Sequence, residues 1–203
     1  MKHQSRPLCR FFGSADSNAK HPILRVGMID LGEEDPMKSL VGVEVLQQLG
    51  IDYVRDASTL GALSEGALRY LFNNGELISL DKDDVLFRLG DCADSFHVVL
   101  QGSVRLVKPR HDGSSAHIRD YTFGHEIGFV AMIGLHGRVG DVLANEPSYL
   151  LRVSCGLFDA LHNEMPNDFG ILLLNLSREM SRRLRDADNR LADAGVDDWS
   201  VAH

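Results

Sequence analysis

The stretch from Gly124 to Leu151 carries the residues best suited to holding a small charged ligand. A glycine-rich turn at Gly124 and Gly128 leads into a short apolar segment, and Arg138 follows before a hydrophobic strand. Backbone amides at such a turn, together with one arginine, form a compartment for a single small anion such as a phosphate. Arginine suits the task because its charge is permanent and its planar fork can hold two oxygens. The sequence therefore predicts an anion pocket here.

The sequence lacks the residue spacing that a metal site or a nucleophilic catalytic site would require. A cupin-type metal site needs two histidines one residue apart with a downstream glutamate, and no zinc-like spacing is present either. The histidines in question are His97, His111, His117, His125 and His136. We interpret them as surface or hydrogen-bonded residues and predict no metal site. Cys155 has no predictable base partner, so a buried structural role suits it better than a nucleophilic one. A barrel enzyme of the cupin type is the least favoured hypothesis, and no catalytic residue is predicted.

The composition narrows the class of protein. The chain has 203 residues, 44% of them hydrophobic, which suits one globular domain with an appended segment. A net charge of −8 argues against nucleic acid as a main partner. The three cysteines are far apart and odd in number, and they favour a reducing cytoplasmic setting. Because no apolar run approaches the roughly 18 residues of a membrane span, we expect no membrane insertion.

The elements that must position the pocket are mainly short strands. Runs of apolar and β-branched residues alternate with turn signals such as Asp83-Asp84, Gly90-Asp91 and Gln101-Gly102. This spacing predicts a small antiparallel sandwich or barrel-like roll. The predicted strands are 76–80, 85–89, 96–100, 104–107, 116–121, 141–144 and 149–153.

Other segments precede these strands. Residues 1–22 are polar and predict a loosely docked arm, and residues 23–31 could form a strand. Asp35 followed by a proline predicts the start of a helix over 35–49. A second short helix is predicted after Ser64, which is a suitable cap.

Helices also follow the strands. A short helix is predicted over 156–163, broken by Pro166, and a long one begins near Asp168. The long helix carries an apolar stripe with steps of 3, 4, 4, 3 and 4 residues, formed by Leu173, Leu176, Met180, Leu184, Ala187 and Leu191. The stripe could pack on its own domain or form the seam of a homodimer. We favour the seam, because the helix is longer than one small roll can cover.

The ordered set of motifs resembles the cyclic nucleotide-binding domain of the catabolite activator protein and of protein kinase A regulatory subunits, over roughly residues 58–192. The resemblance rests on the segments Val85–Asp91, Phe96–Val104 and Asn175–Leu184. It implies a mainly β fold, an antiparallel β-roll (a double-stranded β-helix of jelly-roll type) with N-terminal helices and a long C-terminal helix. The expected divisions are an extension at 1–57, the roll at 58–165, and the helix and tail at 166–203.

The resemblance also assigns a phosphate-binding cassette. Gly128 matches the cassette glycine, and Val130 lies within the cassette. Ala131 matches its small residue, and Arg138 matches the arginine that pairs with the cyclic phosphate about ten residues after the glycine. The implied ligand is a cyclic nucleotide or a related phosphate, and no other cofactor is implied.

The cassette departs from the family pattern at several positions. Phe129 stands where the family has a glutamate that accepts a hydrogen bond from the ribose 2′-hydroxyl. The loss of that hydrogen bond could cost roughly 1.5–3 kcal/mol of binding free energy. We expect Phe129 to fill the vacated pocket. Val139 replaces a small or hydroxyl residue. Ala187 and Asp188 stand about where the family has contacts to the base. Glu126, just before the cassette, could compensate for the missing glutamate.

Two hypotheses follow. The first is a non-catalytic sensor that binds a cyclic nucleotide and signals through its C-terminal helix to a dimer partner or a protein effector. The second is a degenerate module that binds no ligand and acts through dimerisation or protein interaction. A DNA-reading helix-turn-helix unit does not fit in the ten or so residues that follow the stripe, so we expect no DNA partner. The role of residues 1–57 stays open.

Overall fold

The structure is a computed structural model, and it describes residues 42–110 and 112–195. Several expectations fall outside these ranges: the arm at 1–22, the candidate strand at 23–31 and the first part of the helix predicted at 35–49. The tail beyond residue 195 also lies outside them.

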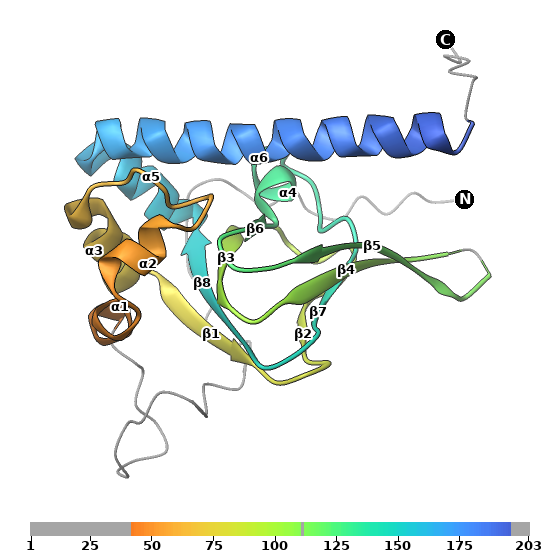
Figure 1. The fold of residues 1–203 in the computed structure, drawn as a ribbon, viewed down its shortest axis with the longest axis horizontal. Helices are drawn as coiled ribbons and strands as arrows, with labels where there is room; N and C mark the ends of the chain where they lie inside the picture. The colour runs from red at the N-terminus through yellow and green to blue at the C-terminus, as the bar shows by residue number, and fades with distance from the viewer. Residues whose placement is uncertain (1–41, 111, 196–203) are drawn as a thin grey trace, which may run out of the picture.

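Two four-stranded antiparallel sheets form the β-roll that the sequence predicts (Figure 1). One sheet has the order β1-β8-β3-β6 and the other β2-β7-β4-β5. The strands are β1 (Glu76–Leu80), β2 (Val85–Phe87), β3 (Ser95–Gln101), β4 (Val104–Pro109), β5 (Ser115–Tyr121), β6 (Glu126–Ile127), β7 (Asp141–Ala144) and β8 (Ser148–Ser154). The seven predicted strands are confirmed, with small shifts at their ends. The sequence does not predict β6, because two residues give no alternation to detect.

Helices cover one end of the roll and one long side (Figure 1). Ser64 caps α3 as predicted, since its Oγ accepts a hydrogen bond of 3.1 Å from the Ala67 amide. The short α2 is not predicted by the sequence. The helices are α1 (Gly42–Leu49), α2 (Ile51–Arg55), α3 (Glu65–Asn74), α4 (Phe129–Ile133), α5 (Cys155–Glu164) and α6 (Pro166–Asp193). In the part of the chain that the structure describes, no helix has both the length and the apolar character needed to cross a membrane.

Strand β3 lies at the centre of the core because both of its faces are buried. One face packs with the helices in a cluster that includes Phe72 of α3, Phe96 of β3 and Leu176 of α6. The other face packs inside the roll, where Val99 meets residues such as Val142 of β7. Helix α1 packs against α3, so the apolar face predicted for this segment is buried by the helical layer.

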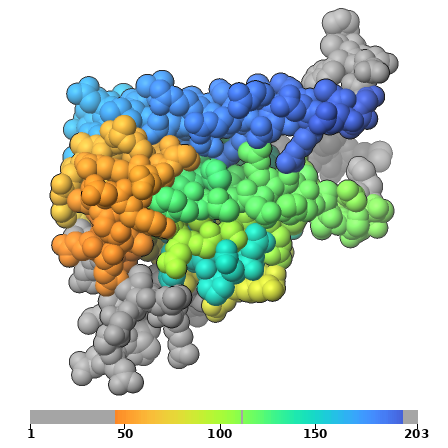
Figure 2. Space-filling view, viewed as in Figure 1, coloured from red at the N-terminus to blue at the C-terminus, as the bar shows by residue number. Residues whose placement is uncertain are grey.

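Helix α6 begins at Pro166, two residues before the start that the sequence suggests. Proline fits the first helical position because the amide it lacks would have no partner inside the helix. Asp168 in the first turn accepts hydrogen bonds from the Ser64 amide (2.7 Å) and hydroxyl (2.9 Å). Further along, the Asn175 side chain donates to the carbonyl oxygens of Thr59 and Gly61. These contacts fix how α6 lies along the molecule (Figure 2).

Part of the apolar stripe of α6 packs on the protein's own domain, and part is left exposed, where a homodimer seam could form. Leu176 is buried in the protein's own core, and Met180 is partly buried against it. Three leucines of the stripe stay exposed: Leu173 at 39%, Leu184 at 64% and Leu191 at 40%. One side of the helix therefore packs on its own domain, while the row formed by Leu173, Leu184 and Leu191 stays exposed to solvent.

Candidate functional site

A cavity of about 680 Å³ lies inside the roll, against strands β1, β2 and β3. We call it the roll cavity. Its apolar wall is formed by Ile78, Leu80, Val85, Leu86 and Phe87. Its polar wall contains Glu76, Ser79, Asp84, Asp91, Asp94, Ser95, His97, Arg138 and Arg152. Such a mixture of an apolar surface and a few polar groups is typical of small-molecule sites.

Arg138 is buried at the edge of this cavity, with an exposed fraction of 4%. Its Nη1 donates to the Gly128 carbonyl oxygen (3.1 Å) and its Nη2 to the Ser95 Oγ (3.2 Å). The guanidinium carbon lies 4.3 Å from the centroid of the Phe87 ring. Its Nε is buried and has no hydrogen-bond partner in the part of the chain that the structure describes. Burial lowers the pKa of Arg138, and the Asp94 carboxylate works in the opposite direction.

The backbone around the cassette is shaped to hold this arginine. Gly128 has φ +92°, and a Cβ at this position would lie 2.3 Å from Arg138 Nη1. Glycine is therefore required both by the backbone conformation and by the close approach. Across the turn, the Arg138 amide donates to the Asp91 carbonyl oxygen (2.9 Å), and the Gly90 amide donates to the Arg138 carbonyl oxygen (2.8 Å). The structure thus brings together the glycine and arginine that the family resemblance pairs.

A second arginine, Arg152 of β8, also lines the cavity, and the sequence gives no signal for it. Its donors are engaged, because it binds Glu76 Oε2 (2.9 Å), Asp94 Oδ2 (3.1 Å) and Ser95 Oγ (3.1 Å). Burial works to raise the pKa of Asp94, but the Ser95 hydrogen bond and the Arg152 charge outweigh it, so this pKa lies below its ordinary value. We interpret Arg152 as part of the wall rather than as a free anion ligand.

His97 of β3 is another cavity residue that sequence reasoning missed. The sequence predicts a surface or hydrogen-bonded histidine, and the surface alternative is wrong because the residue is only 4% exposed. Its Nδ1 has no partner among the described residues. Burial lowers its pKa to about 3, and the charges of Arg138 and Arg152 add to the effect. His97 is therefore neutral at physiological pH.

The Phe129 side chain lies in the core rather than in the cavity. Its ring is fully buried and makes edge contacts with Phe96 (centroids 5.5 Å apart) and Phe158 (5.8 Å). It does not line the roll cavity. The expectation that this ring fills the vacated pocket is therefore wrong: the aromatic cluster beneath α5 takes the ring instead.

The remaining predicted cassette and base-contact residues also lie away from the cavity lining. Ala131 is buried, whereas Val130 and Val139 are exposed at 43% and 42%. Ala187 and Asp188 are exposed on α6. For Ala187 and Asp188 the reason is the rotation of α6, which turns other side chains of the helix toward the roll.

Arg183 is one of those side chains. Its Nη1 lies 2.6 Å from Oε1 of Glu126, and its Nη2 donates to the Glu126 carbonyl oxygen. The other carboxylate oxygen of Glu126 accepts a 3.1 Å hydrogen bond from the Phe129 amide. Burial raises the pKa of Glu126, and the Arg183 charge opposes this shift. Because both oxygens face protein groups, Glu126 is not placed to replace the missing cassette glutamate.

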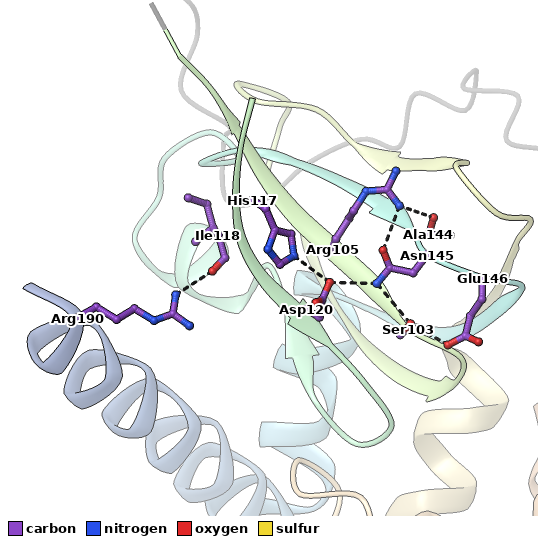
Figure 3. Close-up of polar contacts among 9 residues, drawn as sticks. All are labelled: Ser103, Arg105, His117, Ile118, Asp120, Ala144, Asn145, Glu146 and Arg190. Carbon is purple, nitrogen blue, oxygen red and sulfur yellow. Dashed lines mark hydrogen bonds and ion pairs between the residues drawn. The ribbon is translucent and has the colours of Figure 1, made fainter. Parts of the chain in front are cut away.

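Helix α6 also reaches the edge strand β5 (Figure 3). Arg190 donates to the Ile118 carbonyl oxygen (3.0 Å), and Arg119 binds Asp186 (2.9 Å). Beside this contact, a polar cluster links β4, β5 and the end of β7 through Ser103, Arg105, His117, Asp120, Asn145 and Glu146 (Figure 3). These hydrogen bonds join neighbouring strands, so we interpret the cluster as support for the sheet.

Sequence comparison agrees with this geometry. A sequence model of the cyclic nucleotide-binding domain matches residues 77–164. Lysophospholipase nte1 of Neurospora crassa is 28% identical over 110 residues, which is 54% of this chain and 7% of that protein. Neuropathy target esterase sws of Drosophila virilis is 27% identical over 159 residues, which is 78% of this chain and 10% of that protein. The chain therefore spans a tenth or less of the length of these relatives.

Solved structures share the fold. A cyclic nucleotide-binding domain from Methylobacillus flagellatus superposes with a TM-score of 0.66 and 22% identity, covering 76% of this chain and 87% of that one. The catabolite activator protein of Thermus thermophilus gives a TM-score of 0.59 and 21% identity, covering 68% of this chain and 63% of that one. At these identities the likeness establishes the architecture alone.

Proposed function

We propose that this chain, which contains a domain of the cyclic nucleotide-binding family at residues 77–164, is a non-catalytic regulatory module that binds a cyclic nucleotide or related phosphate ester in the roll cavity. One observation carries the proposal: Arg138 is buried at the cavity and held in place by Gly128 and Ser95, and its Nε–H is among the guanidinium donors that have no partner in the described residues. A buried guanidinium with a spare donor is suited to a phosphate oxygen.

The charges of the cavity wall favour a ligand with a single negative charge. Four carboxylates line the cavity, those of Glu76, Asp84, Asp91 and Asp94, against two arginines. Arg152 is already neutralised by its partners, which leaves Arg138 to attract the ligand. A second ligand charge would meet carboxylates without gaining a second free cation. A cyclic phosphodiester, with one charge, therefore suits the cavity better than a phosphate monoester.

The apolar wall supports the same class of ligand. Ile78, Leu86 and Phe87 offer a surface on which the uncharged part of a nucleotide can be buried. Burying that surface would add hydrophobic stabilisation to the single ion pair at Arg138. The esterase activity in the relatives' names is not extended to this chain, because the matched segment is a tenth or less of those proteins.

Signalling would pass through α6. Gly128, whose carbonyl oxygen holds Arg138, directly follows β6, and Glu126 of β6 is bound by Arg183 of α6. A ligand that moves Arg138 would therefore also shift β6 and change the contact between Glu126 and Arg183 that holds the helix. Two arrangements of α6, one favoured by the ligand, would convert binding into a changed dimer or effector contact.

The exposed row on α6 favours a second candidate function, in which the chain binds no ligand and acts as an interaction module. Leu173, Leu184 and Leu191 are exposed on one helix, and a parallel copy could bury them in a homodimer. Sedimentation of the wild-type chain and of Leu184→Glu tests this seam. We expect a dimer that the substitution dissociates, and a monomeric wild type would contradict the seam.

Isothermal titration calorimetry tests the ligand proposal. Cyclic AMP, cyclic GMP, cyclic di-GMP and 5′-AMP are titrated into the wild type, Arg138→Lys and the control Arg69→Lys. Arg69 lies on the surface of α3 in an exposed ion pair with Glu65, so its variant should bind like the wild type. We expect a cyclic mononucleotide to bind and Arg138→Lys to weaken it at least tenfold, with thermal unfolding confirming that the variant is folded. No heat with any of the four ligands would overturn the proposal and favour the interaction module.

A further inference from the structure

Ser95, at the start of β3, joins the two arginines of the roll cavity. Its side chain is buried, with an exposed fraction of 1%. Its Oγ accepts hydrogen bonds from Arg138 Nη2 (3.2 Å) and Arg152 Nε (3.1 Å). The same hydroxyl donates to Asp94 Oδ1 (2.9 Å). Because a hydroxyl has one donor and two acceptor sites, all three are engaged, and Ser95 has no capacity left for a ligand.

Asp94 holds the two arginines in different ways. Its Oδ2 accepts directly from Arg152 Nη2 (3.1 Å), which makes an ion pair. No ion pair within the described residues joins Asp94 to Arg138. The Ser95 hydroxyl lies between them instead, because it accepts from Arg138 and donates to Asp94. Burial lowers the pKa of Arg138 and the charge of Asp94 opposes this, so the two groups are close enough to interact. Ser95 is therefore a neutral spacer between opposite charges.

The spacer matters for the attraction of a ligand by Arg138. Arg152 shows the alternative, because its charge is compensated directly by Asp94. A guanidinium in such a pair would have to leave its carboxylate before it could bind a phosphate, and separating buried opposite charges is costly. With Ser95 in place, the acceptors of Arg138 among the described residues are two neutral oxygens, those of Gly128 and Ser95. The positive charge of Arg138 therefore stays available for an anion.

We propose that Ser95 is a positioning residue that keeps Arg138 apart from Asp94 and so preserves the affinity of the roll cavity for a phosphodiester. The inference rests on the proposed function, since it concerns the same arginine. Ser95 acts through Arg138 and does not touch the ligand. Without the hydroxyl, a donor of Arg138 and an acceptor of Asp94 would each lose a partner. The two opposite charges would then satisfy each other by forming a direct ion pair.

A crystal structure of Ser95→Ala tests the spacer without any ligand. We expect the Arg138 guanidinium to move to within hydrogen-bond distance of the Asp94 carboxylate. An arginine that keeps its place, with or without a water molecule where the hydroxyl was, would overturn the inference whether or not the protein binds a nucleotide.

Calorimetry then measures the effect on binding. Cyclic AMP and cyclic GMP are titrated into the wild type, Ser95→Ala and the control Ser148→Ala. Ser148 is also a buried, hydrogen-bonded serine of the roll, but it does not line the cavity. We expect Ser95→Ala to weaken binding about tenfold and Ser148→Ala to leave it unchanged, with thermal unfolding confirming that each variant is folded. Equal affinity of the wild type and folded Ser95→Ala would overturn the inference while leaving the proposed function standing.

A double variant separates this role from a structural one. Ser95→Ala combined with Asp94→Asn removes the charge that would capture Arg138, so we expect it to recover most of the affinity that Ser95→Ala loses. A merely structural loss would not be reversed by the second substitution, so a double variant as weak as Ser95→Ala would overturn the inference. If the wild type binds neither nucleotide, the proposed function fails, and the effect of Ser95 on affinity fails with it. The crystal structure still decides whether Ser95 separates the two charges.

Discussion

Acidification should destabilise the folded protein, and the buried His97 accounts for a definite part of that loss. An unfolded histidine has a pKa near 6.5, whereas burial and two neighbouring arginines lower the pKa of folded His97 to about 3. Between these values the unfolded chain binds a proton that the folded protein does not. The contribution of His97 to stability is therefore complete above about pH 6.5 and is lost as the pH falls toward 3.

The size of the effect follows from this difference in bound protons. One proton taken up by the unfolded chain alone changes the free energy of unfolding by about 1.4 kcal/mol per pH unit. Between pH 7 and pH 5 the loss is about 2 kcal/mol, because the unfolded histidine is only partly protonated near pH 6.5. The groups that face the ring are Arg138 and Arg152, which lower its pKa, and Asp94, which raises it.

Urea denaturation of the wild type and His97→Gln at pH 7, 6 and 5 measures this contribution. The variant lacks the titrating ring, and subtracting its free energy of unfolding removes most of the pH dependence that other groups share between the two proteins. We expect the wild type to lose about 2 kcal/mol relative to the variant between pH 7 and pH 5. A difference between the two proteins that does not change with pH would refute the buried, neutral state assigned to His97.

Three further substitutions test the packing around the site. Gly128→Ala should cost about 1–2 kcal/mol for its positive φ and abolish binding of cyclic AMP by displacing Arg138. Gly113→Ala, with φ +81° and no atom of the described residues within 4 Å of its added Cβ, should cost stability alone. Equal binding by the two variants would contradict the role of the cassette glycine. Arg183→Met should cost about 3–5 kcal/mol in urea denaturation, because it leaves the buried glutamate of β6 without its partner; a loss below about 1 kcal/mol would mean that this pair does not hold α6. Phe129→Ala should lower the free energy of unfolding by about 3–5 kcal/mol, as expected for a ring in the core, and a small loss would place the ring at the surface.

The roll could be predicted from the sequence because its signals are local. Each strand alternates between buried and exposed positions or is bounded by turn residues, and glycines such as Gly90 and Gly102 mark positive φ angles at the turns. The pairing of Gly128 with Arg138 could also be predicted, because the family cassette that the sequence resembles places an arginine about ten residues after its glycine, and the two residues are in contact in the structure.

The other cavity residues could not be predicted because they depend on how distant strands align. His97 and Arg152 are paired only by the register of β3 with β8, which the sequence does not give. A single histidine in an apolar strand gives no sign of whether its ring is paired, exposed or turned toward a cavity. The short β6 and α2 were missed for a related reason, since segments of two and five residues carry little periodicity.

The placement of Ala187 and Asp188 shows a different limit. The sequence gives the position of these residues along the helix, but it does not give the rotation of the helix about its axis, which decides which side chains face the roll. That rotation is set by contacts with distant residues, through Arg183 at β6 and Asp186 at β5, and it leaves both residues exposed. For Phe129 the sequence correctly indicated burial but could not choose between two apolar destinations, the cavity and the aromatic cluster.

The most direct test of the central claim is the NMR signal of the Arg138 Nε–H group during a titration with cyclic AMP. This signal is assigned by its absence from the spectrum of Arg138→Lys. Because Nε has no hydrogen-bond partner among the described residues, we expect its resonance to shift and to saturate at one equivalent of ligand. A ligand that binds without moving this resonance, or a resonance that never responds, would contradict phosphate recognition by Arg138.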